Sequence, residues 1–252
     1  MDWFRKDIRK ILPPPFRARH SEYSMIFSLD DDVSRPSDRL ISIALEAISK
    51  AREVDLEDLC GRIKNPPFYP NVWPGEHYKL LAGLALALKP REVVEVGTSM
   101  GLSALAIKKY LSPESKLFTF DIQDWRFHPD YALKREDFAD DRLVQFLDDL
   151  SDPSTCAKYG DLLKKADLIC LDAAKDGISE IRFLENFDCV PLREGSLLVL
   201  DDIRLWNMLK IWREISMPKL DLTSFGHWSG TGLVEWRAKS GGLESRPGKS
   251  QY

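Results

Sequence analysis

The sequence has few cysteines, and their spacing excludes two common uses of that residue. The 252 residues include four cysteines, none in a Cys-x-x-Cys pair. Structural zinc sites and disulfide-stapled domains need closely spaced or numerous cysteines. Because Cys170 and Cys189 also fall within apolar runs, we expect reduced, mostly buried thiols and a cytoplasmic protein.

Long apolar runs and a strong excess of one charge are also missing. No segment approaches the ~20 apolar residues that a membrane-spanning helix needs, and the basic N-terminus lacks the apolar core of a signal peptide. The formal net charge is only −4. The sequence therefore predicts neither a membrane span nor a nucleic-acid-binding surface.

Proline is plentiful near the N-terminus and divides that part of the chain. Three prolines at 13–15 end a possible amphipathic helix over residues 3–11, because proline cannot continue a helix. A proline-rich segment at 65–76 marks a second break. We predict a helical N-terminal extension over 1–70 that forms a lid or a dimer contact.

One helix within this extension can be placed from its own pattern. Ser37 is a suitable N-cap, and the apolar residues that follow recur at helical spacing: Leu40, Ile41, Ala44, Leu45 and Ile48. The main domain is predicted over 71–238, and the polar tail over 239–252 is predicted to be disordered.

The main domain alternates between strand and helix patterns. Short apolar runs predict strands at 92–96, 116–121, 142–147, 166–172, 195–202 and 230–238. Helical patterns occupy 76–88, 101–111, 178–190 and 203–215. Apolar runs that are each followed by helical sequence are typical of parallel strands buried on both faces. The predicted fold is α/β, a doubly wound, mostly parallel Rossmann-like sheet.

Acidic residues follow nearly every predicted strand. They are Asp121, Asp148, Asp149, Asp172, Asp201 and Asp202. A single aspartate at a strand end is a weak signal, because aspartate is common in turns and helix caps. In doubly wound sheets, however, ligands bind beyond the carboxyl ends of the strands. We therefore expect several of these carboxylates to meet at one edge of the sheet.

The first predicted strand leads into a glycine-bounded loop, VVEVGTSMGLSA at 93–104. Gly97 and Gly101 do not fit the dinucleotide or P-loop glycine patterns. Asp121 at the end of the next strand is suited to accept hydrogen bonds from two ribose hydroxyls. Ser103 and the start of the following helix are suited to hold a carboxylate.

This loop, with Asp121 following Gly97 by 24 residues, resembles the S-adenosylmethionine site of class I methyltransferases. It is most similar to the small-molecule O-methyltransferases of the catechol and caffeoyl-CoA type, whose Glu-x-Gly-x-x-x-Gly-Tyr-Ser pattern is matched except that Leu102 replaces the tyrosine. The resemblance covers about residues 71–237. It implies that these residues bind the cofactor: Glu95, Gly97, Thr98, Ser99, Gly101, Ser103, Asp121, Asp149 and Asp172.

The same resemblance implies a divalent metal and a base. The family's Asp-x-x-Lys after the fourth strand is matched by Asp172 and Lys175, both candidate catalytic residues. The family's Asp-Asn after the fifth strand is replaced by Asp201 and Asp202, as in related sugar O-methyltransferases that use three aspartates for the metal. Those relatives carry a further acid where Ala174 stands, so Lys175 is the better candidate base.

The residue types suit this chemistry. Mg²⁺ prefers oxygen ligands and keeps open positions for water or substrate, and a bound hydroxyl loses its proton more easily. We therefore expect an S-adenosylmethionine-dependent, Mg²⁺-assisted O-methyltransferase, a homodimer acting on a small molecule with one or two neighbouring oxygens. Three alternatives stay open: a metal-independent O- or N-methyltransferase, an NAD-type oxidoreductase, and a non-catalytic nucleotide-binding module.

Two of the four histidines, His77 and His227, lie in segments that border the predicted site. Neither matches a ligand of the family pattern, so we expect structural roles for both.

Overall fold

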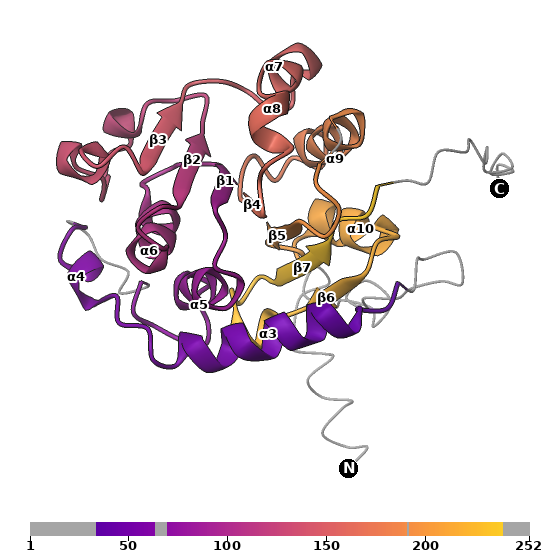
Figure 1. Cartoon of the computed structure of the whole chain (residues 1–252), viewed down its shortest axis with the longest axis horizontal. Coiled ribbons are helices and arrows are strands. Elements are labelled where there is room, and N and C mark those ends of the chain that lie inside the picture. Colours follow the sequence, from indigo (N-terminus) through magenta and orange to yellow (C-terminus); the bar gives the residue numbers. More distant parts are fainter. Residues whose placement is uncertain (1–33, 64–69, 191, 239–252) are drawn as a thin grey trace, which may run out of the picture.

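The computed structural model describes residues 34–63, 70–190 and 192–238 (Figure 1). The predicted helix over 3–11 and the predicted disorder of 239–252 fall outside these residues. The described part forms one seven-stranded sheet in the order β3-β2-β1-β4-β5-β7-β6. Its strands are β1 (Glu92–Val96), β2 (Lys116–Phe120), β3 (Leu143–Phe146), β4 (Leu168–Leu171), β5 (Leu197–Asp201), β6 (Lys219–Asp221) and β7 (Thr231–Glu235).

Strands β1 to β5 are parallel, and β7 runs antiparallel to both β5 and β6. The chain leaves β1 towards β2 on one side and later returns to β4 on the other side. This reversal of strand order is the point at which ligands bind in doubly wound sheets. The predicted doubly wound, mostly parallel sheet is therefore confirmed.

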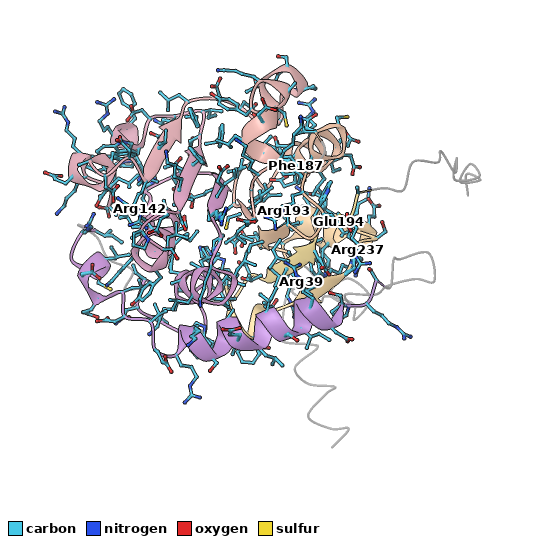
Figure 2. All side chains as sticks on the ribbon, in the orientation of Figure 1. Arg39, Arg142, Phe187, Arg193, Glu194 and Arg237 are labelled. Atoms are coloured by element: carbon cyan, nitrogen blue, oxygen red, sulfur yellow. The ribbon has the colours of Figure 1, made fainter. Side chains whose placement is uncertain are left out.

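Helices cover both faces of the sheet (Figure 1). They are α3 (Asp38–Ala51), α4 (Glu57–Cys60), α5 (Tyr78–Leu88), α6 (Leu102–Tyr110), α7 (Pro153–Lys158), α8 (Gly160–Leu163), α9 (Ser179–Cys189) and α10 (Trp206–Glu214). Successive side chains of β1 point to opposite faces: Val93 joins the core under α3, α5 and α6, and Val94 joins the core under α7 to α10. Phe187 of α9, labelled in Figure 2, belongs to the second core.

Helix α3 begins as predicted, because the Ser37 hydroxyl accepts a hydrogen bond from the Leu40 amide at 3.0 Å. Its buried stripe is narrower than the apolar pattern indicated, since Ile41 and Leu45 are exposed.

Helix α3 packs closely on α5. A Cβ on Gly83 of α5 would lie 2.3 Å from the Ala47 carbonyl oxygen, so only glycine allows this approach. The predicted boundary at residue 70 stays a prediction, although α3 shares one core with α5 and β1.

Among the α-helices and strands that the structure describes, four were not individually predicted: helices α4, α7 and α8 and strand β6. Each has six residues or fewer, too short for a period to be visible in the sequence. All four cysteines are free thiols, as expected. The expectation that they are mostly buried is wrong for two of them, because Cys189 is exposed and Cys60 is partly exposed. Within the described residues, no helix is both long and apolar enough to span a membrane.

Candidate functional site

Three of the predicted carboxylates meet at the carboxyl edge of the sheet. Strands β4 and β5 are parallel neighbours with Leu171 opposite Leu200, so the residues that follow, Asp172 and Asp201, end side by side. One oxygen from each of Asp172, Asp201 and Asp202 lies within 4.8 Å of the other two. Helix α10 starts only at Trp206, so Asp202 does not cap it.

The ammonium group of Lys175 lies among these three carboxylates. Its Nζ is 3.0 Å from Asp172 Oδ1, 3.3 Å from Asp202 Oδ2 and 3.9 Å from Asp201 Oδ2. Burial alone would lower the pKa of Lys175, but the three carboxylates outweigh burial and raise it. Lys175 therefore holds its proton in this arrangement and balances part of the acidic charge.

The loop that carries Lys175 has an unusual backbone. Ala174 and Lys175 have positive φ angles of 48° and 62°, a region that non-glycine residues rarely adopt. Glu180 of α9 holds the loop by accepting hydrogen bonds from the amides of Lys175 (2.6 Å) and Gly177 (3.0 Å). Such strain persists only where surrounding contacts enforce it, and it often marks functional sites.

Both histidines that were expected to border the site contact the acids, and their expected structural roles stay a prediction. His77 Nδ1 lies 3.1 Å from Asp201 Oδ1, and His227 Nδ1 lies 3.3 Å from both Asp201 Oδ2 and Asp202 Oδ1. Burial alone would lower the pKa of His227, but hydrogen bonds with the two aspartates raise it to about 10. Glu76 adds a further acid, 3.6 Å from His227 Nε2. The two imidazoles thus contact one oxygen of Asp201 each.

These histidines arrive on two loops that pair with each other. The Gly75 amide donates to the Gly226 carbonyl, and the Trp228 amide donates to the Gly75 carbonyl, both at 3.1 Å. The Trp73 indole nitrogen donates to the Phe225 carbonyl at 2.8 Å. Trp228 is 71% exposed beside His227. Among these aromatic side chains, Trp228 is the one with a described contact to a histidine that touches the acids.

The glycine loop has the predicted strand–turn–helix structure. Gly97 has φ 104°, and a Cβ there would lie 1.9 Å from the Asp172 carbonyl oxygen, so the loop passes directly beside the end of β4. Gly101 has φ 85° and directly precedes α6. No side chain caps the start of α6, so amides near Ser103 remain available to an anionic group.

Asp121 faces this loop from the end of β2. Its Oδ2 accepts a hydrogen bond from the Ser99 amide at 2.9 Å. The Thr98 side chain points the other way, into the interior, where its hydroxyl lies 2.7 Å from the Thr119 hydroxyl. Asp149 accepts hydrogen bonds from the amide and hydroxyl of Ser151. The carboxylate of Asp121 is thus the one placed across the glycine loop.

Glu95 connects the glycine loop with the acid cluster. The side chain is buried, and its Oε2 accepts a hydrogen bond from the Thr119 hydroxyl at 2.5 Å. Its Oε1 has no hydrogen-bond partner among the described residues. A pocket of about 10 Å³, roughly the space of one water molecule, is lined by Glu95 together with Ser103, Asp172 and Asp201. This pocket thus adjoins three of the predicted cofactor residues, Glu95, Ser103 and Asp172, and two of the predicted metal ligands, Asp172 and Asp201.

Part of the chain is similar in sequence to a known O-methyltransferase. No family model matches the chain. Over 133 residues it is 30% identical to catechol O-methyltransferase B from Danio rerio, a match that covers 49% of this chain and 47% of that protein. The chain thus spans about half the length of this relative.

Two solved structures are more distant in sequence. The methyltransferase PaMTH1 from Podospora anserina, bound to SAH, has a TM-score of 0.49 and 17% identity, covering 82% of this chain and 90% of its own. A methyltransferase from Geobacter sulfurreducens has a TM-score of 0.49 and 16% identity, and the match covers 93% of this chain and 96% of that protein. In sequence, about half of the chain resembles a catechol O-methyltransferase, as its glycine loop and acidic strand ends predicted.

Proposed function

We propose that this protein is an S-adenosylmethionine-dependent O-methyltransferase that methylates a hydroxyl group of a small molecule with the help of a divalent cation. One observation carries the proposal. The glycine loop with Asp121 and the cluster of Asp172, Asp201 and Asp202 lie at the same edge of the sheet, with Glu95 between them. Methyl transfer requires the donor and the acceptor to be held side by side.

The cofactor would occupy the glycine loop. Asp121 would accept hydrogen bonds from the ribose hydroxyls, and the uncapped start of α6 beside Ser103 would hold the carboxylate group. Glu95, whose Oε1 has no partner in the described part of the chain, and Asp172 line the pocket between the loop and the acids and would hold the amino group. The remaining candidates are Gly97, Thr98, Ser99, Gly101 and Asp149.

The donor set suits a hard divalent cation. Three carboxylate oxygens converge within 4.8 Å, and the buried ammonium group of Lys175 lies among them without a hydrogen bond to any residue that the structure describes. Asp172, Asp201 and Asp202 would hold Mg²⁺ or a similar ion. When bound, the ion would lower the pKa of a coordinated hydroxyl.

The chain's own residues would move the proton. Lys175 Nζ lies beside all three acids and is the proposed proton acceptor. It becomes a base only when another positive charge compensates the carboxylates that now raise its pKa. His77 and His227 would fix the orientation of Asp201, as outer-shell partners of metal ligands do.

The proposed acceptor is a small molecule with one or two neighbouring oxygens. Trp228 lies beside His227, which contacts two of the acids, and Trp73 stacks on Phe225 in the paired loops. These aromatic side chains would contact the carbon skeleton of the acceptor. The free cysteines are consistent with a cytoplasmic location, and a homodimer is part of the same proposal.

A second candidate is a metal-independent O- or N-methyltransferase on the same fold. It is favoured by the positive charge already present at the acids, supplied by Lys175 and by two histidines with raised pKa values. In that case the protein would promote methyl transfer only by holding the methyl donor and the acceptor in position.

The test combines cofactor binding with methyl transfer. Calorimetry with S-adenosylmethionine should give saturable binding that persists in excess EDTA. Transfer of labelled methyl groups to a panel of small diols and phenols should be abolished by EDTA and restored by Mg²⁺. Full transfer in EDTA would select the metal-independent candidate. A folded protein that does not bind S-adenosylmethionine would overturn the proposed function.

A further inference from the structure

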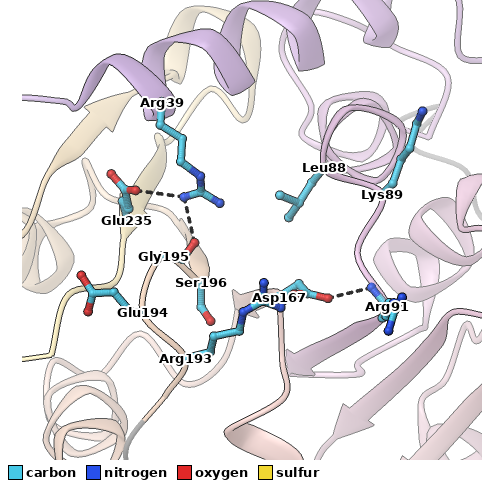
Figure 3. A pocket seen from close by; sticks show the side chains of 10 residues that line it. All are labelled: Arg39, Leu88, Lys89, Arg91, Asp167, Arg193, Glu194, Gly195, Ser196 and Glu235. Atoms are coloured by element: carbon cyan, nitrogen blue, oxygen red, sulfur yellow. Dashed lines mark hydrogen bonds and ion pairs between the residues drawn. The ribbon is translucent and has the colours of Figure 1, made fainter.

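A second and larger cavity lies at the opposite, amino edge of the sheet. Its volume is about 720 Å³, within the ~300–1,000 Å³ typical of small-molecule sites. Its lining includes Arg91, Asp167 and Ser196, which directly precede β1, β4 and β5 (Figure 3). The proposed methyl-transfer site occupies the other ends of these same strands, so the two sites are separate.

Four basic and three acidic side chains line this cavity, but two of the acids are already satisfied by the protein. Asp167 accepts hydrogen bonds from the Arg91 amide (2.7 Å) and from the Arg193 guanidinium. Glu235 accepts from the Ser37 hydroxyl and from Arg39 Nη1 (2.9 Å). These carboxylates therefore have little remaining capacity to bind a cationic ligand.

The arginines, in contrast, keep unused donors. Arg39 and Arg193 each use only Nη1 in hydrogen bonds among the described residues. The Arg91 side chain has no hydrogen bond or ion pair with any residue that the structure describes, whereas its backbone is fixed beside Asp167. Figure 3 shows Arg39, Arg91 and Arg193 on different sides of the cavity, with Leu88 as an apolar wall.

The position of Arg39 is fixed in advance of any ligand. Its Nη1 donates to the Gly195 carbonyl at 2.8 Å as well as to Glu235. Gly195 has φ 80°, a backbone conformation that favours glycine, and its carbonyl faces Arg39. Figure 2 shows Arg39, Arg193 and Glu194 gathered near one another in the whole molecule. Preorganised guanidinium groups lose less conformational freedom when they bind.

From this arrangement we infer that the amino-edge cavity binds a small molecule carrying a phosphate or diphosphate group. Guanidinium groups form planar, paired hydrogen bonds with phosphate oxygens. Three arginines with spare donors around one cavity suit a compact group with several anionic oxygens. The remainder of the ligand would lie against Leu88. This site is independent of the proposed methyl transfer.

Titration of the full-length protein with pyrophosphate tests the inference. Calorimetry is carried out at constant ionic strength in EDTA, so that no metal at Asp172, Asp201 or Asp202 can carry the anion. We expect saturable binding with one site per chain. Sulfate at the same ionic strength serves as the comparison for general attraction of anions.

Three arginine variants locate the site. Arg91→Gln and Arg193→Gln should each weaken pyrophosphate binding roughly tenfold or more, as expected for a lost charge-assisted hydrogen bond. Arg91→Gln removes no hydrogen bond within the described residues, so its folding is not at risk. Arg182→Gln, at an exposed position of α9 outside the cavity, should bind like wild type.

Three results would overturn the inference. The first is the absence of saturable pyrophosphate binding in the wild-type protein. The second is equal pyrophosphate binding in all three variants, and the third is equal affinity of the wild-type protein for sulfate, because either would mean that the anion does not recognise this arrangement of arginines.

Discussion

Glu95 is an acidic residue held inside the protein with one oxygen unpartnered among the described residues. Burial raises its pKa to about 7, although hydrogen bonds from Ser103 and Thr119 oppose the increase. An unfolded glutamate loses its proton near its ordinary pKa of 4.5. Ionisation of Glu95 therefore lowers the free energy of unfolding of the cofactor-free protein progressively as pH rises from about 4.5 to 7. Above that range the loss of stability no longer changes with pH.

Glu95→Gln should remove this pH-dependent loss of stability, because glutamine does not ionise. The free energy of unfolding of the variant, relative to wild type, should increase by about 2 kcal/mol between pH 5 and pH 8. Urea denaturation at the two pH values measures the difference. Glu46→Gln, at an exposed position of α3, controls for the loss of one negative charge. A difference that does not change with pH would show that Glu95 ionises normally.

Asp121 is the single side chain on which the proposed ribose contact depends. Asp121→Ala should weaken S-adenosylmethionine binding by about 1–3 kcal/mol, because it removes a charge-assisted acceptor and releases the Ser99 amide. Calorimetry on the folded variant measures the change, and Asp161→Ala at a highly exposed position is the control. Unchanged affinity in Asp121→Ala would rule out this assignment.

At the scale of secondary-structure elements, helix α3 is tied to β7 by one carboxylate. Glu235 accepts hydrogen bonds from the N-cap Ser37 and from Arg39. Burial alone would raise the pKa of Glu235, but these hydrogen bonds outweigh burial and lower it. A carboxylate with a lowered pKa contributes stability above its unfolded pKa and loses that contribution as pH falls through the folded pKa.

Glu235→Gln should therefore destabilise the protein by about 1–2 kcal/mol at pH 7. The difference from wild type should shrink as pH falls below 4.5 towards 3, because the wild-type carboxylate becomes protonated. Urea denaturation over this pH range measures both values. A destabilisation of equal size at pH 7 and pH 3 would mean that the charge of Glu235 does not hold α3.

The sequence predicted the longer helices and the strands whose residues are mostly apolar. The five parallel strands are short and mostly apolar, and the ends of β2, β4 and β5 placed Asp121, Asp172 and Asp201 at one edge. The sequence did not reveal the roles of His77 and His227. Their position depends on the pairing of Gly75 with His227, a contact between loops about 150 residues apart that no local pattern encodes. Arg39 is likewise placed at the amino-edge cavity by contacts that are distant in sequence, since its partners Gly195 and Glu235 lie 156 and 196 residues further along the chain.

At the scale of the whole molecule, the acid cluster links cation binding to stability. Three carboxylates that lie close together repel one another unless a positive charge compensates them. In this structure Lys175 supplies part of that charge. A bound divalent cation would supply more and would stabilise the folded state according to its concentration and affinity.

Lys175→Met tests this link between cation binding and stability. In EDTA the variant should be less stable than wild type by about 2–3 kcal/mol, because the acids lose their partner. Saturating Mg²⁺ should restore its stability and raise its melting temperature more than that of wild type. Thermal unfolding with and without Mg²⁺ measures both effects, with Lys164→Met as a surface control. If Mg²⁺ stabilises neither protein, the cluster does not bind the ion.

The most direct test of the central claim is a crystal structure of the protein grown with S-adenosylhomocysteine and Mn²⁺. We predict electron density for the nucleoside along Gly97–Gly101 with its ribose at Asp121. We also predict an anomalous manganese peak between Asp172, Asp201 and Asp202, with the Lys175 ammonium displaced from the position it has here. Density for the nucleoside elsewhere, or no manganese peak with Lys175 still paired to the acids, would contradict a metal-assisted methyltransferase.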